Sequence, residues 1–591
     1  MANVQPTGTG VFAQMIQVAF AGHNRPHDLG RHGPVIAGLD AALAMIKEAG
    51  VHEARLLTGL ADGADELAAA AWRRAGLGPV HAVFPFLQDQ HSGGVGPVGA
   101  AESATWLDGA SSEAQGRNPH LKQTRLIVET ADLVVVVWTG DAARGAGGTA
   151  DAVLSALEIG LPVLWIKPSD YKHLRLIRPE KLPSDFHFPE FREALEQERL
   201  RHMEFATPDN LRAVLGLDAE HHDDEGHHEH DHHPHAHAKA KPDKPPKPPA
   251  GKMRQHMDNW LHGWLWRTHR VFRLLLGGKV EVVDEGPETP ADLKEQPGFK
   301  LLSEAYAHAD QNANRLSAVH RSEQLLLILA MIAAAIVGSL PGLWPDFKLW
   351  AVGIEMVLGV GALMVWASAA DANQHEQWGL HRYLAEQLRL ERAGWALGVS
   401  LASVGATQHS PRESDRAREV RRAAGLPHGH YDAERVQSWG HWAMGELVQG
   451  QSGYHRAISL RDGRIAHRIH FAEDMSFLAL FVLFSAYLAL HMVLPHGHEL
   501  PKWVTGFVTM AGTVVPALGA AAMALEAKLE FGEQSERSRR IAHALDRLTR
   551  RLGPSPSFDE LQNTARAAMR LHIAEASHWK EGVSRRRLFR P

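Results

Sequence analysis

The chain contains no cysteine among its 591 residues. Disulfide bonds, zinc sites built on cysteine and catalysis by a thiol are therefore excluded. An excess of one charge is also missing, because 62 basic residues nearly balance 68 acidic residues and the formal net charge is only −6. A general surface for nucleic acid is not expected from this balance, so nucleic acid is not among the predicted partners.

A secretion signal is not visible at the start of the sequence. Residues 1–10 lack the basic start followed by an apolar run that is typical of a cleavable signal peptide. We therefore expect the N-terminal region to lie in the cytosol.

The composition changes along the chain and predicts five segments. These are an α/β domain at 1–218, a His/Lys/Pro-rich linker at 219–252, an amphipathic segment at 253–300, and two membrane hairpins, each with a cytosolic helix, at 301–425 and 426–591. The expected fold class is thus a doubly wound α/β domain followed by an all-α membrane domain with four transmembrane helices.

Strand and helix patterns alternate in the first 170 residues. Short apolar runs predict strands, and segments of helical spacing predict helices at 34–49, 64–75 and 149–159. The predicted strands lie at 16–21, 55–58, 80–84, 133–138 and 162–166. The run 133–138 is apolar throughout, as expected of a central parallel strand that is covered on both faces. Such alternation predicts a doubly wound sheet.

Three glycine-rich loops follow predicted strands, so they share the carboxyl edge of the sheet, where ligands bind in such folds. Glycine lets backbone N–H groups approach a phosphate, and the next helix adds a favourable dipole. Alternatively, these glycines only form tight turns. The predicted ligand-binding residues are Gly22, Arg25, Thr58, Gly59, Asp62, Gly63, Asp65, Glu66, Arg144, Gly145, Gly147, Gly148 and Thr149.

These loops resemble those of the SLOG superfamily, a Rossmann-like group that includes LOG phosphoribohydrolases and nucleotide sensors. The similar segments are TGLADGADELAAAA, ADLVVVVWTG and GGTADAV, and the resemblance covers roughly residues 14–168. In LOG enzymes the loop threonine is followed three residues later by a catalytic glutamate, whereas Thr149 is followed there by Ala152. The resemblance therefore implies nucleotide binding without a catalytic residue, and no cofactor beyond that nucleotide is expected.

The linker at 219–252 has a composition that is typical of disorder. Its histidines and carboxylates can bind metal ions without fixed geometry, and no specific metal site is predicted. After it, apolar and aromatic residues at helical spacing, interleaved with arginines, favour a helix at the membrane surface. Packing of this helix on the soluble part is the alternative.

Four apolar segments of about 20 residues match the thickness of a bilayer. They lie at 325–344, 349–370, 475–494 and 503–525, and form two hairpins with short connections. Arginines flank the spans on the other side, whereas the two connections contain only Lys348 and Lys502 as basic residues. The positive-inside rule therefore predicts an inner (plasma) membrane protein with both termini in the cytoplasm.

The two hairpins look related. Glu376, Arg382 and Leu388 after the second span recur as Glu533, Arg539 and Leu545 after the fourth, always 157 positions later. A two-span hairpin followed by such a helix resembles the SLATT family of prokaryotic membrane effectors, here present twice over roughly residues 301–591. This resemblance implies a pore-forming or membrane-disrupting effector that responds to a nucleotide signal of infection.

Two residues inside the spans are candidates for pore lining or gating. Glu355 places a carboxylate within the second span, which is costly unless it faces water, a partner or a protein interior. Pro516 can bend the fourth span. Both residues also have purely structural explanations, in hairpin assembly and in a fixed kink. Four spans do not readily enclose a pore, so a homo-oligomer is expected.

Together these features predict a nucleotide-gated membrane effector of a prokaryotic anti-phage system. Its partners would be a cyclic or ADP-ribose-type nucleotide and the lipid bilayer. The alternative is a membrane-anchored, LOG-like N-glycosidase in which one of the carboxylates Asp62, Asp65, Glu66 and Asp151 positions or activates water. A nucleotide-regulated transporter is a third interpretation, although the spans offer few polar residues for a substrate.

Overall fold

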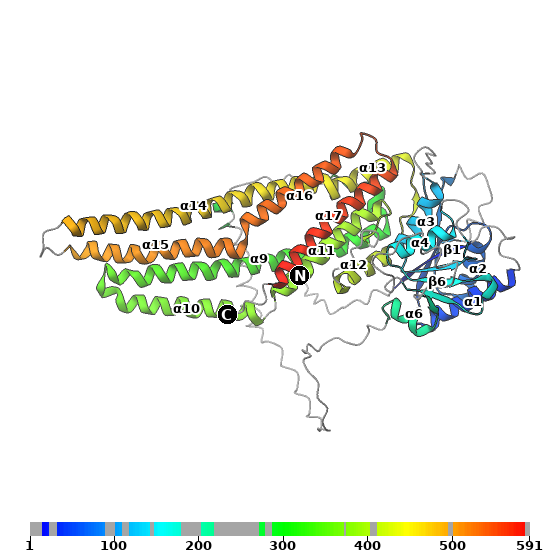
Figure 1. Cartoon of the computed structure of the whole chain (residues 1–591), viewed down its shortest axis with the longest axis horizontal. Coiled ribbons are helices and arrows are strands. Elements are labelled where there is room, and N and C mark those ends of the chain that lie inside the picture. Colours follow the sequence, from blue (N-terminus) through cyan, green and yellow to red (C-terminus); the bar gives the residue numbers. More distant parts are fainter. Residues whose placement is uncertain are drawn as a thin grey trace, which may run out of the picture.

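The computed structural model has an α/β domain at one end and four long helices at the other, with a helical stalk between them (Figure 1). The described residues are 15–22, 32–88, 101–108, 118–141, 147–178, 203–217, 271–272, 274–277, 287–371, 374–401, 411–493 and 500–585.

A nine-stranded, mostly parallel sheet forms the centre of the α/β domain, in the order β8-β7-β6-β5-β1-β2-β3-β4-β9. The strands are β1 (Ile16–Gly22), β2 (Ala54–Thr58), β3 (Val80–Phe84), β4 (Ser103–Trp106), β5 (Leu133–Val137), β6 (Val163–Ile166), β7 (Arg175–Ile177), β8 (Met203–Phe205) and β9 (Gly429–His430). Val18 of β1 is in register with Leu56 of β2 and Leu133 of β5. The pairs β6–β7 and β7–β8 are antiparallel, and the other described pairs are parallel.

Helices cover both faces of this sheet. The helices are α1 (His32–Glu48), α2 (Ala64–Ala75), α3 (Pro119–Thr130), α4 (Thr149–Glu158) and α6 (Pro208–Val214), with a 3₁₀ turn, η5, at Pro168–Asp170. The buried residues of α1, α2 and α6 share one core with the sheet, and those of α3 and α4 belong to a second core. Continuous apolar strands such as β5 are fully buried because both faces are covered.

The five predicted strands and three predicted helices of this domain are confirmed, with boundaries within a few residues. The structure also contains two helices, α3 and α6, and four strands, β4, β7, β8 and β9, that the sequence pattern did not predict. These extra strands have only two to four residues each. Such short segments carry too little periodicity to be recognised.

The helical part is built from two similar units. The first consists of α9 (Pro297–Ser339), α10 (Lys348–Asp371) and α11 (Gln374–Ala396), and the second of α14 (Gly450–Val493), α15 (Lys502–Leu529) and α16 (Phe531–Arg551). The remaining elements are α8 (Ala291–Glu295), α12 (Pro411–Ala424), α13 (Ala433–Met444), α17 (Phe558–Arg585), the 3₁₀ turns η8 (Leu340–Gly342) and η9 (Pro345–Phe347), and the π-helix η12 (Gly445–Gln449).

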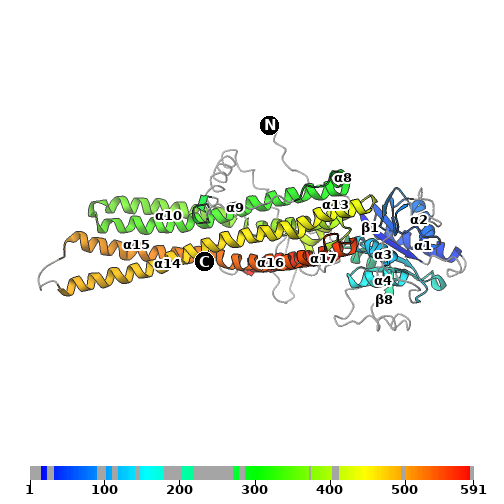
Figure 2. The same cartoon turned by 90° about the horizontal axis from the view of Figure 1, so that it is seen from above.

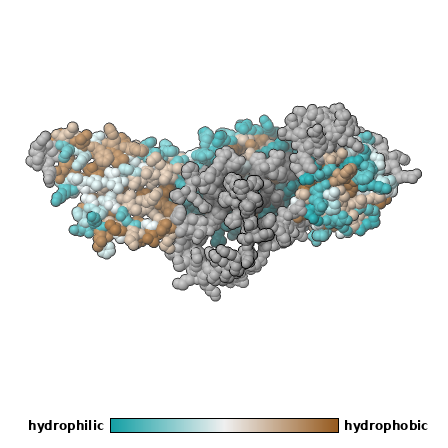
Figure 3. Space-filling view, turned by 60° about the horizontal axis from the view of Figure 1, so that its bottom comes forward, coloured by the Kyte–Doolittle hydropathy of each residue, from teal (hydrophilic) through white to brown (hydrophobic). Residues whose placement is uncertain are grey.

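Four helices of the described chain are long and apolar enough to cross a membrane. In two perpendicular views α9, α10, α14 and α15 lie side by side, with the η8–η9 turn, the end of α14 and the start of α15 at their outer ends (Figure 2). Apolar side chains such as Phe481, Met356 and Trp350 are exposed along them. In the space-filling view, brown and pale residues accordingly cover much of this end (Figure 3). A protein surface this apolar requires a lipid environment or a partner.

The predicted amphipathic segment at 253–300 lies largely outside the described residues. Residues 287–300 of it are described and include α8 and the start of α9, and the described residues 271–272 and 274–277 pack on the stalk. Phe272 and Leu276 join a small core with Ile465 and Phe531, and Arg468 donates a hydrogen bond to the Leu276 carbonyl oxygen at 2.7 Å. Leu275 remains 72% exposed. This segment therefore has one face on the stalk and one apolar face outside it.

Candidate functional site

The carboxyl edge of the sheet brings the predicted loops together. Strand β1 lies between β2 and β5, and α1, which follows β1, covers the opposite face of the sheet from α4, which follows β5. Helices α2, α3 and α4 all begin at this edge. Gly147 adopts φ 86°, and a Cβ there would lie 2.3 Å from the carbonyl carbon of His120. Only glycine permits this close approach between the third loop and the start of α3.

The second loop is closed around its own carboxylate. Asp65 is 7% exposed and accepts hydrogen bonds from the backbone N–H groups of Ala61, Gly22 and Gly59 and from the Thr58 hydroxyl. Leu60 adopts a left-handed backbone conformation with φ 47°, which residues other than glycine rarely adopt. The Asp65 carboxyl group thus accepts hydrogen bonds from the backbone N–H groups that the glycine pattern predicted for a ligand.

Burial raises the pKa of Asp65 to about 7, although the same hydrogen bonds from Ala61, Thr58, Gly22 and Gly59 oppose the rise. Desolvation penalises the charged carboxylate, while N–H donors favour it. The Asp65 carboxyl group therefore ionises near neutral pH.

The third loop has a similar internal contact. Gly147 donates its N–H to Oδ2 of Asp151 at 2.6 Å, and its carbonyl oxygen accepts the Thr124 hydroxyl at 2.8 Å. Gly148 precedes α4 in extended conformation, with no side-chain cap on the helix. The first N–H groups of α4 have no partners within the helix, and their dipole favours an anion.

The predicted ligand-binding residues therefore fall into three groups. Arg25, Arg144 and Gly145 lie outside the described residues. Thr58, Asp65 and Thr149 are buried, and Gly22, Gly59, Gly63, Gly147 and Gly148 form the loops themselves. Asp62 and Glu66 are exposed on the edge. The structure brings the described residues to one edge, and their role in binding a nucleotide stays a prediction.

Helix α3 connects this edge to the helical stalk. Near its start, Gln123 donates to the Val83 carbonyl oxygen at 2.6 Å, beside Gly59. On its other face, Lys122 lies 3.2 Å from Asp559 at the start of α17. At its end, one guanidinium nitrogen of Arg566 on α17 contacts both carboxylate oxygens of Glu129, at 2.9 and 3.1 Å. Thus α17 follows α3 for most of the length of α3.

The helical part also completes the sheet. Strand β9 pairs with β4, and the Tyr431 N–H donates to the Trp106 carbonyl oxygen at 2.7 Å. Asp132, just before β5, accepts from the Gln17 N–H at 2.9 Å and from Nε of Arg422 at 2.6 Å. One hydrophobic core contains residues of α3, β5, α11, α13 and α17. The α/β domain and the stalk are therefore packed as one unit.

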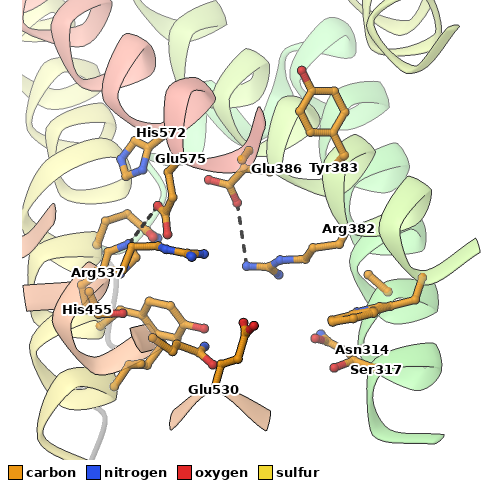
Figure 4. A pocket seen from close by; sticks show the side chains of 18 of the residues that line it. Asn314, Ser317, Arg382, Tyr383, Glu386, His455, Glu530, Arg537, His572 and Glu575 are labelled. Carbon is orange, nitrogen blue, oxygen red and sulfur yellow. Dashed lines mark ion pairs between the residues drawn. The ribbon is translucent and has the colours of Figure 1, made fainter. Parts of the chain in front are cut away.

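A polar cavity of about 340 Å³ lies inside the stalk, between α9, α11, α14, α16 and α17 (Figure 4). Arg382 points into it and lies 3.9 Å from Glu386 and 3.5 Å from Asp310. Arg321 lies over the Trp378 ring, 5.8 Å from its centroid. The sequence reading did not predict this site, because it is assembled from five helices.

One wall of the cavity carries a potential metal-ligand set. His455 on α14, and His572 and Glu575 on α17, place ligand atoms within 4.8 Å of one another. Burial lowers the pKa of both histidines to about 4, and each is lowered further by a neighbouring positive or imidazole group. Burial, aided by Glu386, raises the pKa of Glu575 to about 7. Both imidazoles are therefore neutral at neutral pH.

The sequence contains a weak signal for this set. His572 and Glu575 are three residues apart, so they share a face of one helix. Nothing local points to His455, which joins them only through the packing of α14 against α17.

The predicted gating residues are separate from this cavity. Glu355 on α10 faces α9, and a Cβ on Gly338 would lie 2.1 Å from its Oε1 atom. Pro516 lies within the continuous helix α15 and is exposed. Glu355 thus packs within the first hairpin, where Gly338 provides the space for its carboxyl group.

No protein-family model matches this chain, and no curated protein matches it.

Proposed function

We propose that the protein is a nucleotide-gated membrane effector, in which a ligand at the carboxyl edge of the α/β sheet controls the four spans. The observation that carries this proposal is that α3 contacts both the glycine-loop edge, through Gln123, and α17, through Lys122 and Glu129. A ligand that moves the start of α3 must also disturb its contacts with the stalk. The SLOG and SLATT resemblances favour a prokaryotic anti-phage role and a homo-oligomeric pore.

The nucleotide class is supported by the sheet topology. Strand order places β1 between β2 and β5, and a crevice at such a reversal is where doubly wound, Rossmann-like sheets bind nucleotides. The N-terminus of α4 beside Gly147 and Gly148 offers amides to a phosphate. To change the ratio of open to closed protein from 1:99 to 99:1, the ligand must bind the open state more tightly by about 5.5 kcal/mol. Such a preference requires several charged contacts, as an ADP-ribose-type or cyclic nucleotide can make.

Leakage from liposomes tests this proposal. The purified protein is reconstituted, and release of a trapped ion is followed during addition of cyclic dinucleotides, ADP-ribose and nucleoside monophosphates. We expect one class to trigger release at micromolar concentration. The proposal would be contradicted if ion release were the same in the presence of each nucleotide as in the absence of any nucleotide.

Gly148 allows a matched pair of variants. Its φ of −73° and extended ψ suit asparagine and aspartate, which are both good helix N-caps. Gly148→Asp places a carboxylate where the phosphate would lie, and should raise the nucleotide concentration needed for release at least tenfold. Gly148→Asn has almost the same shape without the charge and should have a smaller effect. Equal responses of the two variants would argue against a phosphate at α4.

A second candidate function is N-glycosidic cleavage of a nucleotide at the same edge. Asp65 and Asp151 are engaged with loop amides, so Asp62 and Glu66 are the exposed carboxylates that could activate water. Free base after incubation with nucleoside monophosphates, lost in Asp62→Asn or Glu66→Gln, would favour the enzyme. Glu53→Gln, an exposed acid at the start of β2, is the control and should change nothing.

A further inference from the structure

The wall of the stalk cavity formed by α14 and α17 has the chemistry of a cation site. Nε2 of His455 lies 3.7 Å from Oε2 of Glu575, and the rings of His455 and His572 are 6.5 Å apart. In a tetrahedral zinc site with bonds of 2.0–2.2 Å, neighbouring ligand atoms are about 3.3 Å apart. Since the three ligand atoms lie within 4.8 Å of one another, a closure of at most about 1.5 Å would bring them to a common ion.

The hydrogen bonds of the two histidines leave ring nitrogens available. Nε2 of His572 lies 2.9 Å from the Leu447 carbonyl oxygen, to which it can only donate, so Nδ1 of the neutral ring keeps its lone pair. Metal-binding histidines are commonly fixed by this kind of bond to a backbone carbonyl. Nδ1 of His455 is buried and has no hydrogen-bond partner among the described residues. Nδ1 can therefore carry the proton of the neutral ring, which leaves the lone pair on Nε2, the nitrogen that faces Glu575.

The positive charges around this wall are largely matched by carboxylates. Arg537 on α16 pairs with Glu533 at 2.8 Å, and Arg382 and Arg389 on α11 share Glu386. Arg461 on α14 pairs with Asp462 at 2.9 Å. Arg321 on α9 packs on Trp378. Asp310 is a second partner of Arg382, and Glu530 adds a further carboxylate to the same lining. A divalent cation therefore does not face an uncompensated cluster of arginines.

We propose that His455, His572 and Glu575 bind a divalent transition-metal ion of the zinc class, which joins α17 to α14. Two imidazoles and one carboxylate suit Zn²⁺, and the cavity has room for water as the remaining ligand. Helix α14 continues from His455 into the third span, and α17 continues back to α3. The ion would thus fasten the C-terminal helix to a membrane helix.

Metal binding to the full-length protein tests this proposal without nucleotide or leakage. Histidines at this density, between residues 221 and 237, can bind metal ions themselves, so they are replaced by serine in every protein compared. Co²⁺ is the probe, because its absorption reports the number and type of ligands, and Zn²⁺ competition gives the affinity. We expect one ion per chain. His455→Ala and Glu575→Gln should each weaken binding at least tenfold.

His467→Ala is the matched control, since this histidine lies exposed on the same helix and should leave binding unchanged. If His455→Ala unfolds the stalk, as judged by circular dichroism, Glu575→Gln preserves the side-chain shape and decides the question. Absence of stoichiometric Co²⁺ binding, or binding that the folded Glu575→Gln protein retains at full affinity, would overturn the proposal. Either result would leave the nucleotide response of the α/β domain untouched.

Discussion

At the scale of single residues, the glycine pattern predicted where the loops lie but not what fills them. The spacing around Thr58 and Gly63 predicted a turn rich in free amides. This spacing did not indicate that the Asp65 side chain is buried and accepts hydrogen bonds from three of these N–H groups. The direction of that side chain depends on how α2 packs against β1. For the same reason His455 could not be linked to His572 from the sequence.

Asp65 should make the stability of the protein depend on pH. Its pKa is about 7 in the folded protein and near 4 when unfolded, so between these values the folded state holds a proton that the unfolded chain has released. Stability therefore falls as pH rises through this window, by on the order of 4 kcal/mol from this group. Asp65→Asn should reduce the difference between melting temperatures measured at pH 5 and pH 8.

The neighbouring substitution Asp62→Asn is the control for that experiment. Asp62 is exposed, so its variant should retain the dependence of the original protein. If Asp65→Asn also retained it in full, the buried carboxyl group would not be its source.

The contact of Arg566 with Glu129 should be a strong link between the domains. Both side chains are mostly buried, and burial raises the pKa of Glu129 even with Arg566 beside it. Arg566→Met would leave the carboxylate buried without a partner, at a cost of roughly 3 kcal/mol. Thermal unfolding in detergent measures this cost.

Arg74→Met tests an ion pair of the opposite kind. Arg74 and Asp40 are each 54% exposed, and such surface pairs contribute less than about 1 kcal/mol. Comparable losses in the two variants would mean that Glu129 finds water or another donor when Arg566 is removed.

At the scale of elements, long periodic segments were predictable and edge elements were not. The apolar run of β5 and the four spans carry their own signal over many residues. Strand β9 has two residues and pairs with β4 because the stalk holds it there. No local pattern around Gly429 distinguishes it from a turn, so the ninth strand was missed.

The first hairpin offers a test of element packing. Gly338→Val would place its Cβ 2.1 Å from Oε1 of Glu355 and should destabilise the hairpin by about 1 kcal/mol. Adding Glu355→Ala removes the obstructing group and should restore the melting temperature. Gly353→Val on α10 is the control, because nothing lies within 4 Å of a Cβ there. A failure of rescue would show that Gly338 is required for another reason.

At the scale of the whole molecule, the orientation in the membrane can be tested because the chain lacks cysteine. Any introduced cysteine is the only thiol. If both hairpin tips are external, Asp346→Cys and Lys502→Cys should react with a membrane-impermeant thiol reagent added to spheroplasts. Asn563→Cys on α17 should react only after lysis. Labelling of Asn563→Cys in intact spheroplasts would reverse the proposed orientation.

The shared core also has a consequence for the order of events during synthesis. Glu129 and Arg566 are separated by 437 positions, and β4 gains its neighbour β9 only after the first hairpin has been made. At roughly 5–20 residues per second, the N-terminal region waits about 20 to 90 s for Arg566. During that time one face of α3 remains uncovered, and the edge of β4 remains uncovered until β9 has been made. A chain truncated before α17 should therefore depend on chaperones or be degraded, even though its first domain is fully translated.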